Sequence, residues 1–247
     1  MNGDPVIERV ASIASTNAEI ITRLSGDRPP VERFWLVADR QTGGRGRMGR
    51  EWQDGAGNFM GSTVVHLRPD DPAPQTLALV AGLAVYDTVA EQMPDPRGLM
   101  LKWPNDVLFD GAKLAGILLE RAGNAVVVGV GVNLSVAPAL PDRKAATLKQ
   151  VGVTVYRDFF AFNLANAMAT ALQIWREQGL PEIIARWTQR GPAPGTPLGA
   201  DLGGEGRVDG GFAGLDDTGA LLLRLEDGTM RAIHAGEVSL LGGDKGV

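Results

Sequence analysis

The stretch KWPNDVLFDGAKLAGILL, residues 102–119, decides how the chain folds. Its two apolar runs, residues 107–109 and 114–119, flank Asp110 and Gly111. An Asp-Gly dipeptide supplies the positive φ angles that a two-residue type I′ turn requires. The sequence therefore predicts a β-hairpin centred on this turn.

The turn also sets the register of the hairpin. With two turn residues, Leu108 pairs with Lys113 and Asp106 pairs with Ala115. Side chains alternate between faces along a strand, so we expect Asp106 and Lys113 on one face as diagonal neighbours. Such a pair is either an ordinary exposed ion pair, which contributes little to stability, or a carboxylate and a cation that meet a shared ligand.

Apolar spacing predicts the elements on either side of the hairpin. The first helix is expected to begin with Thr16 as its cap and Glu19 as the capping-box partner. The predicted strands cover residues 7–13, 34–38, 58–67 and 126–134, and the later helices cover residues 75–92, 158–175 and 182–188. These elements give an α+β fold, a mixed β-sheet with helices.

A second, smaller domain is indicated by the change in composition at RGPAPGTP, residues 190–197. Proline and glycine at this density are typical of a linker. The segment beyond it is rich in glycine and shows only short strand-like runs, at residues 206–212, 220–225 and 230–234. We therefore predict a large domain over residues 1–190 and a small β-barrel-like domain over residues 194–247.

The composition of the 247 residues excludes several kinds of chemistry. There is no cysteine, which removes disulfides, thiolate zinc sites and cysteine nucleophiles. The two histidines, His66 and His234, are far apart in the sequence, so a metal would have to be held by carboxylates or substrate phosphates. No apolar run has the length of a membrane span and the first residues do not have the order of a signal peptide. We therefore expect a cytoplasmic protein with no membrane partner.

The charge is concentrated in the small domain. Residues 194–247 contain nine acidic and four basic side chains, which equals the net charge of −5 of the whole chain. Residues 1–193 are balanced. Binding to a phosphate backbone needs an excess of Lys and Arg, so a general nucleic-acid surface is not expected.

A Gly-Arg window, QTGGRGRMGREW at residues 41–52, contains four glycines and three arginines within eight residues. Successive glycines let backbone N–H groups converge on an anion, and guanidinium groups bind phosphate oxygens with paired donors. The composition also fits a solvated basic loop or an Arg-Gly element that binds RNA. The window contains neither the phosphate-loop motif nor the dinucleotide fingerprint.

Two further segments allow both a functional and a structural interpretation. Ser15, Thr16 and Asn17 lie at a helix N-terminus, which suits a polar neutral or anionic group but is also explained by plain capping. Glycines in the buried strand at residues 129–133 make room either for a ligand or for tight packing.

In chain order, these segments resemble the signatures of the biotin protein ligases, which attach biotin to a lysine of biotin-dependent carboxylases. The resemblance extends over essentially the whole chain. It rests on Ser15-Thr16-Asn17, the Gly-Arg window, Lys102-Trp103-Pro104-Asn105-Asp106, KLAGILLE at residues 113–120, residues 129–133 and GEVSL at residues 236–240.

The resemblance implies a fold and a reaction. The fold is the class II synthetase-like fold of biotin and lipoate ligases, with a biotin- and ATP-binding catalytic domain and an SH3-like C-terminal barrel. In the first step, the biotin carboxylate attacks the α-phosphate of ATP to give biotinyl-5′-adenylate and pyrophosphate. In the second, a lysine amine of a biotin carboxyl carrier domain attacks the acyl carbon. Biotin and ATP are the expected substrates, with Mg²⁺.

The resemblance also implies site residues. The expected catalytic residues are Arg47, Lys113 and Asp106, and Asp106 is also the expected metal ligand. Biotin is expected to contact Ser15, Thr16, Asn17, Gln41, Arg45, Gly46, Arg47, Lys113 and Gly116. ATP and its phosphates are expected to contact Arg45, Arg47, Arg50, Trp52, Lys102, Asn105 and Asn133.

Only fourteen residues precede Ser15, so we expect a monofunctional ligase without the N-terminal DNA-binding domain of some relatives, and no nucleic-acid partner. A homodimer is left open. The alternatives are a lipoate protein ligase, which shares the fold and the adenylate chemistry, and a non-enzymatic Arg-Gly nucleic-acid-binding protein or biotin-sensing regulator. An octanoyl transferase of the same fold would need the cysteine that this chain lacks.

Overall fold

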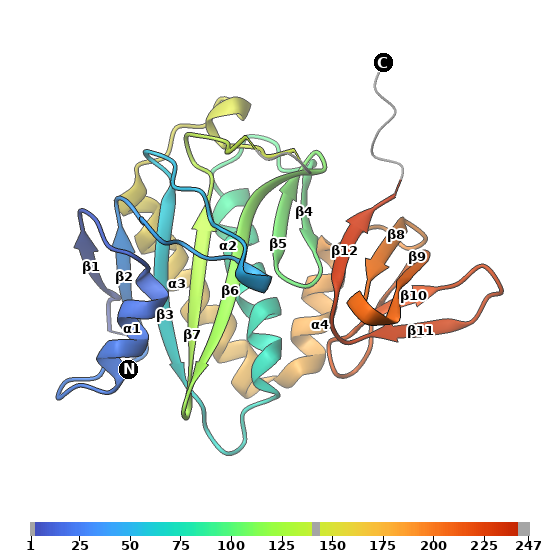
Figure 1. The fold of residues 1–247 in the computed structure, drawn as a ribbon, viewed down its shortest axis with the longest axis horizontal. Helices are drawn as coiled ribbons and strands as arrows, with labels where there is room; N and C mark the ends of the chain where they lie inside the picture. Colours follow the sequence, from blue (N-terminus) through green and yellow to red (C-terminus); the bar gives the residue numbers. More distant parts are fainter. Residues whose placement is uncertain (1–2, 140–143, 242–247) are drawn as a thin grey trace.

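The computed structural model describes residues 3–139 and 144–241. Residues 1–2 and 242–247, at the ends of the two predicted domains, and residues 140–143 lie outside the described residues. The described chain forms a seven-stranded sheet of order β1-β2-β3-β7-β6-β5-β4 and a five-stranded sheet of order β11-β10-β9-β8-β12 (Figure 1). The large sheet is mixed, because β1 and β2 run parallel while all the other neighbouring strands of this sheet pair antiparallel. The predicted α+β class is confirmed.

The elements of the large sheet and its helices occupy the first 190 residues. The strands are β1 (Val6–Val10), β2 (Phe34–Ala38), β3 (Phe59–His66), β4 (Leu99–Lys102), β5 (Asp106–Phe109), β6 (Ala112–Ala122) and β7 (Ala125–Val132). The helices are α1 (Thr16–Leu24), α2 (Leu77–Ala90), α3 (Arg157–Glu177) and α4 (Gly179–Arg190), with short 3₁₀ turns η1 (Arg47–Gly49), η2 (Pro74–Thr76) and η3 (Lys149–Val151). Helices α2 and α3 cover one face of the sheet and α1 covers part of the other (Figure 1).

The central strand β7 explains why a cavity forms on the α1 face. Its alternate residues from Val126 to Val132 pack in the core under α2 and α3, while Ala125 and Val127 pack under α1. The next two positions on the α1 face are Gly129 and Gly131, which have no side chain to fill the space. The sheet is therefore hollow beyond the end of α1.

The hairpin forms as predicted at its turn, but its register changes further along. Asp110 and Gly111 have φ angles of 47° and 76°, and Leu108 pairs with Lys113. The register shifts between Val107 and Leu108, so Asp106 pairs with Gly116 and the predicted pairing with Ala115 is wrong. A β-bulge, which adds one residue to one strand, accounts for the shift.

The start of α1 also differs from the prediction. Ser15, not Thr16, is the N-cap, since its side chain accepts a hydrogen bond from the Ala18 N–H. Glu19 does not complete a capping box but pairs with Arg23 one turn later. Thr16 is thereby released from capping and points its hydroxyl toward other partners.

The small sheet follows α4. Its strands are β8 (Pro197–Asp201), β9 (Arg207–Leu215), β10 (Leu221–Arg224), β11 (Met230–Ile233) and β12 (Glu237–Leu240), with the 3₁₀ turn η4 (Gly203–Glu205). The rings of Trp187 in α4 and Phe212 in β9 lie 6.4 Å apart, and Trp103 donates its indole N–H to the Gly219 carbonyl. One apolar cluster contains residues of both sheets, so the two predicted domains, 1–190 and 194–247, share one core. The boundary between them stays a prediction. Among the helices of the described residues, none is long and apolar enough to span a membrane.

Candidate active site

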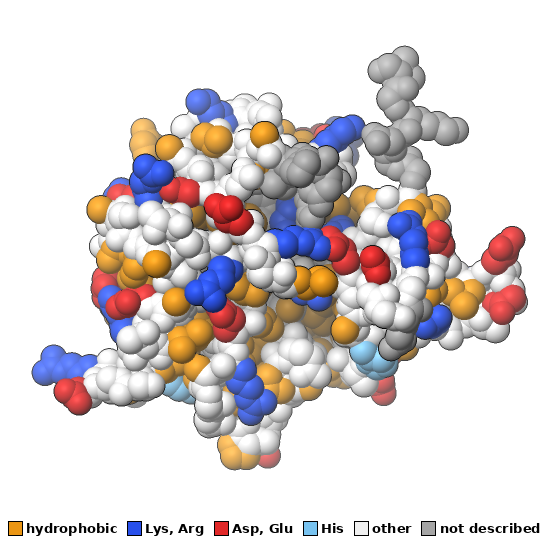
Figure 2. Space-filling model, in the orientation of Figure 1, with side chains coloured by type: hydrophobic (Ala, Val, Ile, Leu, Met, Phe, Trp, Pro, Cys, Tyr) orange, Lys and Arg blue, Asp and Glu red, His pale blue; other side chains and the backbone are white. Residues whose placement is uncertain are grey.

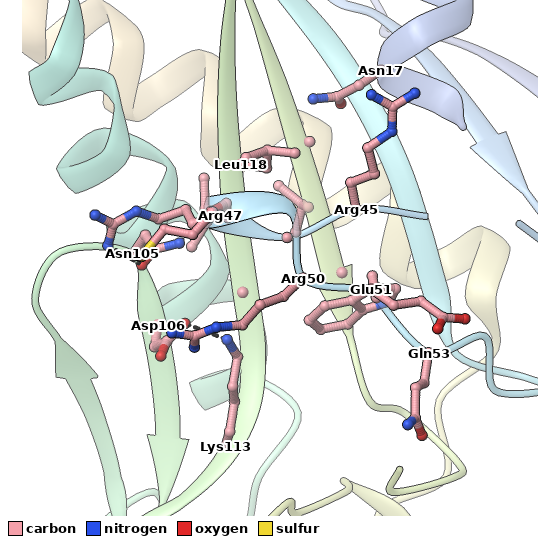
Figure 3. Close-up of a pocket in the computed structure, with 18 of the residues that line it drawn as sticks. Asn17, Arg45, Arg47, Arg50, Glu51, Gln53, Asn105, Asp106, Lys113 and Leu118 are labelled. Carbon is pink, nitrogen blue, oxygen red and sulfur yellow. Dashed lines mark hydrogen bonds and ion pairs between the residues drawn. The ribbon is translucent and has the colours of Figure 1, made fainter. Parts of the chain in front are cut away.

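One cavity of about 340 Å³ opens on the α1 face of the large sheet, beside the small sheet. Figure 2 shows Lys and Arg side chains next to a hollow lined by hydrophobic side chains near the middle of this face. All of the site residues expected from the sequence line this one cavity: Ser15, Thr16, Asn17, Gln41, Arg45, Gly46, Arg47, Arg50, Trp52, Lys102, Asn105, Asp106, Lys113, Gly116 and Asn133. Segments far apart in the sequence therefore converge on a single site (Figure 3).

The end of the cavity at α1 is polar and tightly hydrogen-bonded. Gln41 Oε1 accepts hydrogen bonds from the backbone N–H of Thr16, at 2.7 Å, and from its hydroxyl, at 3.1 Å. Asn17 lies behind this pair and is 4% exposed. Its amide covers Gly129, where an added Cβ would lie 2.4 Å from Asn17 Oδ1. Gly129 is thus required by side-chain packing at this end.

Two residues of this network were missed by the sequence analysis. Ser62 in β3 is fully buried and its hydroxyl lies 2.6 Å from Thr16 Oγ1 and 2.5 Å from Asn17 Oδ1. Glu120 in β6 accepts a 2.7 Å hydrogen bond from Asn17 Nδ2. Both lie behind the side chains that line the cavity. Glu120 ends the KLAGILLE signature at residues 113–120 but was given no role, and Ser62 lies in no motif.

The middle of the cavity is apolar, and Trp52 forms much of it. Its ring lies over Gly131, where an added Cβ would be 2.3 Å from Trp52 Cζ2, and beside Gly116. Within the described residues, the buried indole N–H has no hydrogen-bond partner. The ring is 5.8 Å from Lys113 Nζ, within cation–π range. Gly131 is therefore needed to admit the indole, while an added Cβ at Gly116 would lie 3.1 Å from the ring and would only crowd it.

The opposite end of the cavity is cationic. Lys102 Nζ lies 3.0 Å from Asp106 Oδ2, and Lys113 Nζ lies 2.6 Å from Asp106 Oδ1. Asp106 is only 7% exposed. Burial alone would raise the pKa of Asp106, but the two ammonium groups outweigh it and hold the pKa below its ordinary value. The expected contact between Asp106 and Lys113 is present despite the shifted register.

The Gly-Arg window folds back on itself beside this end. Gly46 N–H donates to the Arg50 carbonyl at 2.7 Å, and Trp52 N–H donates to the Gly44 carbonyl at 3.0 Å. The turn between them is η1, where Met48 has a φ of 57°. The window therefore reaches across the cavity as a short irregular loop with few backbone hydrogen bonds.

This loop contacts the small sheet through its arginines. Arg47 donates to Asn105 Oδ1 at 3.4 Å and to the carbonyl of Gly236 at 3.3 Å. Arg50 forms a two-pronged ion pair with Glu237 at the start of β12. Arg45 extends on the other side of the loop, toward Asn17 (Figure 3). The small sheet thus supports the loop over the cavity.

Asn133 holds the wall next to Lys113. Its side chain donates to the Lys113 carbonyl at 3.3 Å. Asn58, a residue that the sequence analysis did not assign, accepts from the N–H groups of Ser135 and Val136, at 3.0 Å each. These amides fix the turn that follows β7.

The site fits an anion better than a metal ion held by protein ligands. The described residues contain no group of three carboxylate or imidazole side chains arranged to hold a metal. Each oxygen of Asp106 already faces a lysine. Three arginines and two lysines line the cavity against three acidic side chains, Glu51, Asp106 and Glu237.

The chain is similar in sequence and fold to known proteins. The model of the biotin/lipoate A/B protein ligase family matches residues 12–136, and that of the biotin protein ligase C-terminal domain matches residues 202–241. The chain is 38% identical to a biotin–[acetyl-CoA-carboxylase] ligase of Paracoccus denitrificans, over 93% of this chain and 98% of that protein. It is 36% identical to the enzyme of the same name from Mycobacterium tuberculosis, over 94% and 88%. A biotin protein ligase from Aquifex aeolicus, solved in complex with biotin and ATP, has a TM-score of 0.82 at 28% identity, over 95% of this chain and 98% of that one.

Proposed function

The chain belongs to the biotin/lipoate A/B protein ligase family, and we propose that it is an ATP-dependent biotin protein ligase that biotinylates a carboxylase through biotinyl-5′-adenylate. The relatives named above are called biotin ligases, and one was solved with biotin and ATP. The acceptor group in this proposal is a lysine on the biotin carboxyl carrier domain of the carboxylase.

One observation carries the proposal: a single cavity has a hydrogen-bonding end at α1, an apolar middle and an end with two lysines. Biotin has the same order of groups, with a ureido ring, an apolar ring and chain, and a carboxylate. The neutral donors and acceptors of Thr16 and Gln41 suit the ureido group. Trp52 and the bare glycines suit the apolar part, and Lys113 suits the carboxylate. The order of groups fixes which end of biotin meets ATP.

The cationic end supplies what adenylate formation needs. A carboxylate oxygen of biotin attacks the α-phosphorus of ATP, the bond to the bridging oxygen breaks, and pyrophosphate leaves. Charge moves from the carboxylate to the phosphate oxygens during this step. Lys113 and Arg47 are proposed to stabilise that charge, because preorganised cations lower the barrier. Arg45 extends toward Asn17 (Figure 3), so its contact with the phosphate stays a prediction. Lys102, Asn105, Arg50 and Asn133 are proposed to hold the ATP side.

The second step transfers biotin to the acceptor. The lysine amine attacks the acyl carbon, a tetrahedral centre forms, and AMP leaves. Arg47 and Lys113 would keep the acyl phosphate in place until the acceptor arrives. No cysteine is needed, because transfer proceeds directly from the adenylate.

Asp106 is proposed to position Lys102 and Lys113. The sequence predicts that it is a metal ligand, but its surroundings do not suit that role. A buried carboxylate between two ammonium groups, at 2.6 and 3.0 Å, has no oxygen free of a cation. We therefore assign no step of the reaction to a metal held by this residue. The cytoplasmic location and the absence of a nucleic-acid partner stay predictions, and a homodimer stays open.

Biotin-dependent exchange of labelled pyrophosphate into ATP tests the proposal, with lipoate as the parallel substrate. We expect exchange with biotin, little with lipoate, and transfer of biotin to a purified carrier domain whose acceptor lysine is intact. A carrier domain with that lysine changed to arginine is the control. Exchange with lipoate alone would support the lipoate ligase alternative, and exchange with neither substrate would overturn the proposal.

A further inference from the structure

The polar end of the cavity contains a hydrogen-bond chain that continues behind its wall. Its links are Thr16 Oγ1, Ser62 Oγ, the Asn17 side-chain amide and Glu120, joined by contacts of 2.6, 2.5 and 2.7 Å. Thr16 and Asn17 line the cavity, while Ser62 and Glu120 do not. Ser62 is fully buried, so its hydroxyl must find its partners within the protein.

Glu120 fixes the orientation of the Asn17 side-chain amide. A carboxylate only accepts hydrogen bonds, so Asn17 must direct its amide nitrogen to Glu120 and its oxygen to Ser62. Gly129 leaves room for the amide in this position, since an added Cβ would be 2.4 Å from Asn17 Oδ1. The choice between the two amide orientations is therefore made by the anion.

The orientation of Asn17 decides what the hydroxyls do. A hydroxyl has one proton, so Ser62 cannot donate to both Asn17 and Thr16. With the Asn17 oxygen facing Ser62, the Ser62 proton goes to Asn17. Thr16 then directs its own proton toward Ser62 or toward Gln41, which lies at 3.1 Å. In either case the lone pairs of Thr16 Oγ1 are left toward the cavity.

We propose that Glu120 is a positioning residue that makes Thr16 a hydrogen-bond acceptor for a ureido N–H of biotin. The proposal rests on the proposed function, because it concerns how that ligand is selected. Without Glu120, Asn17 can reverse its amide, Ser62 can donate to Thr16, and the Thr16 proton can point into the cavity. The site would then lose its preference for an N–H group at this position.

The test measures binding of biotin and of its two carbamate analogues, in which one ureido N–H is replaced by a ring oxygen. Titration calorimetry without ATP gives the Kd of each for the full chain. The wild type should bind biotin better than at least one analogue. In Glu120→Ala we expect the Kd for biotin to rise roughly 5- to 10-fold, the loss of about one hydrogen bond, while the Kd of the disfavoured analogue changes less than about 2-fold. The Kd of Glu120→Gln for biotin should lie between those of the wild type and Glu120→Ala.

The control is Glu19→Gln, a carboxylate in α1 that pairs with Arg23 away from the cavity, and it should leave every Kd unchanged. Ser62→Ala removes the middle link of the same chain. The double variant Ser62→Ala/Glu120→Ala should therefore weaken biotin binding by less than the two single effects combined. A purely structural role would lower the affinity for biotin and analogue equally. That result, or unchanged discrimination in a folded Glu120→Ala protein, would overturn the inference. A wild type that binds neither biotin nor the analogues would instead overturn the proposed function.

Discussion

The two ends of the cavity are held in different ways. At the polar end, Thr16, Asn17 and Ser62 belong to a helix and a strand of the large sheet, and their side chains hydrogen-bond to one another. At the cationic end, the contacts of Arg47 and Arg50 join an irregular loop to β12 of the small sheet. Regular structure therefore preforms the polar end, while the other end also depends on a glycine-rich loop, which we expect ligand contacts to order.

Lys113→Ala should have the largest effect, because it removes the fixed cation nearest the proposed carboxylate. We expect the single-turnover rate of adenylate formation to fall about 100- to 1,000-fold, as for loss of one stabilising donor. Lys113→Arg should also be poor, because a broad planar group replaces a compact charge. Lys149→Ala, an exposed lysine of η3, is the control. A normal adenylation rate in Lys113→Ala would contradict the account.

Asp106→Asn should destabilise the protein by about 3 kcal/mol at pH 7, since it leaves Lys102 and Lys113 without their buried counter-ion. Burial raises the pKa of Asp106, but the two lysines more than offset it, so the pKa is lowered in the folded protein. A carboxyl whose pKa is lowered by folding stabilises the folded state at pH values above its ordinary pKa. This contribution is lost as the pH falls through the folded-state pKa. The difference in unfolding free energy between Asp106→Asn and the wild type should therefore be constant from pH 8 to about 5 and shrink below about pH 4.

Urea unfolding at a series of pH values measures this difference. Asp217→Asn, at an exposed carboxylate of the small sheet domain, should show no comparable loss. A difference between Asp106→Asn and wild type that grows as the pH is lowered would mean that the sign of the proposed coupling is wrong.

Arg47→Ala should weaken retention of the adenylate. A charge-assisted contact is worth roughly 1.5 to 3 kcal/mol, so release of biotinyl-adenylate should accelerate roughly 10- to 150-fold. Labelling of bystander lysines should rise in step. Rapid filtration of preformed adenylate measures the release, with the exposed Arg28→Ala as the control. Unchanged release would remove Arg47 from the proposed role.

Glu237→Gln should have the smallest effect. It weakens the ion pair to Arg50, but both side chains are about 40% exposed, and such pairs contribute at most about 1 kcal/mol. Adenylate release should change by no more than about 5-fold. Glu226→Gln, exposed in the same small domain, is the matched control. A much larger loss would show that the small sheet holds the loop more tightly than its exposed contacts suggest.

The long periodic elements and the hairpin could be predicted because their patterns are local. The strands β4 and β8 could not. β4 has only four residues, and β8 begins at a proline and contains a glycine, so neither has a readable alternation. The bulge that pairs Asp106 with Gly116 lies beyond the Asp-Gly turn, whose two residues set only the pairing next to them.

The cavity residues could be predicted from their motifs, whereas the two residues behind them, Ser62 and Glu120, were not predicted. Ser62 is one polar residue in the strand FMGSTVVH, and a polar side chain in a fully buried strand was a usable signal. Glu120 ends an apolar run, where a solvated charge is the ordinary interpretation. Only the geometry shows that both meet Asn17.

Amide hydrogen exchange of the free protein and of its complex with biotinyl-adenylate tests the difference between the two ends most directly. Ordering a flexible residue costs on the order of 1 to 2 kcal/mol, so a loop that closes only over ligand should exchange fast without it. We predict that protection of residues 43–49 rises strongly in the complex, while protection at the start of α1, residues 18–22, changes little. Equal protection of residues 43–49 with and without ligand would contradict the account.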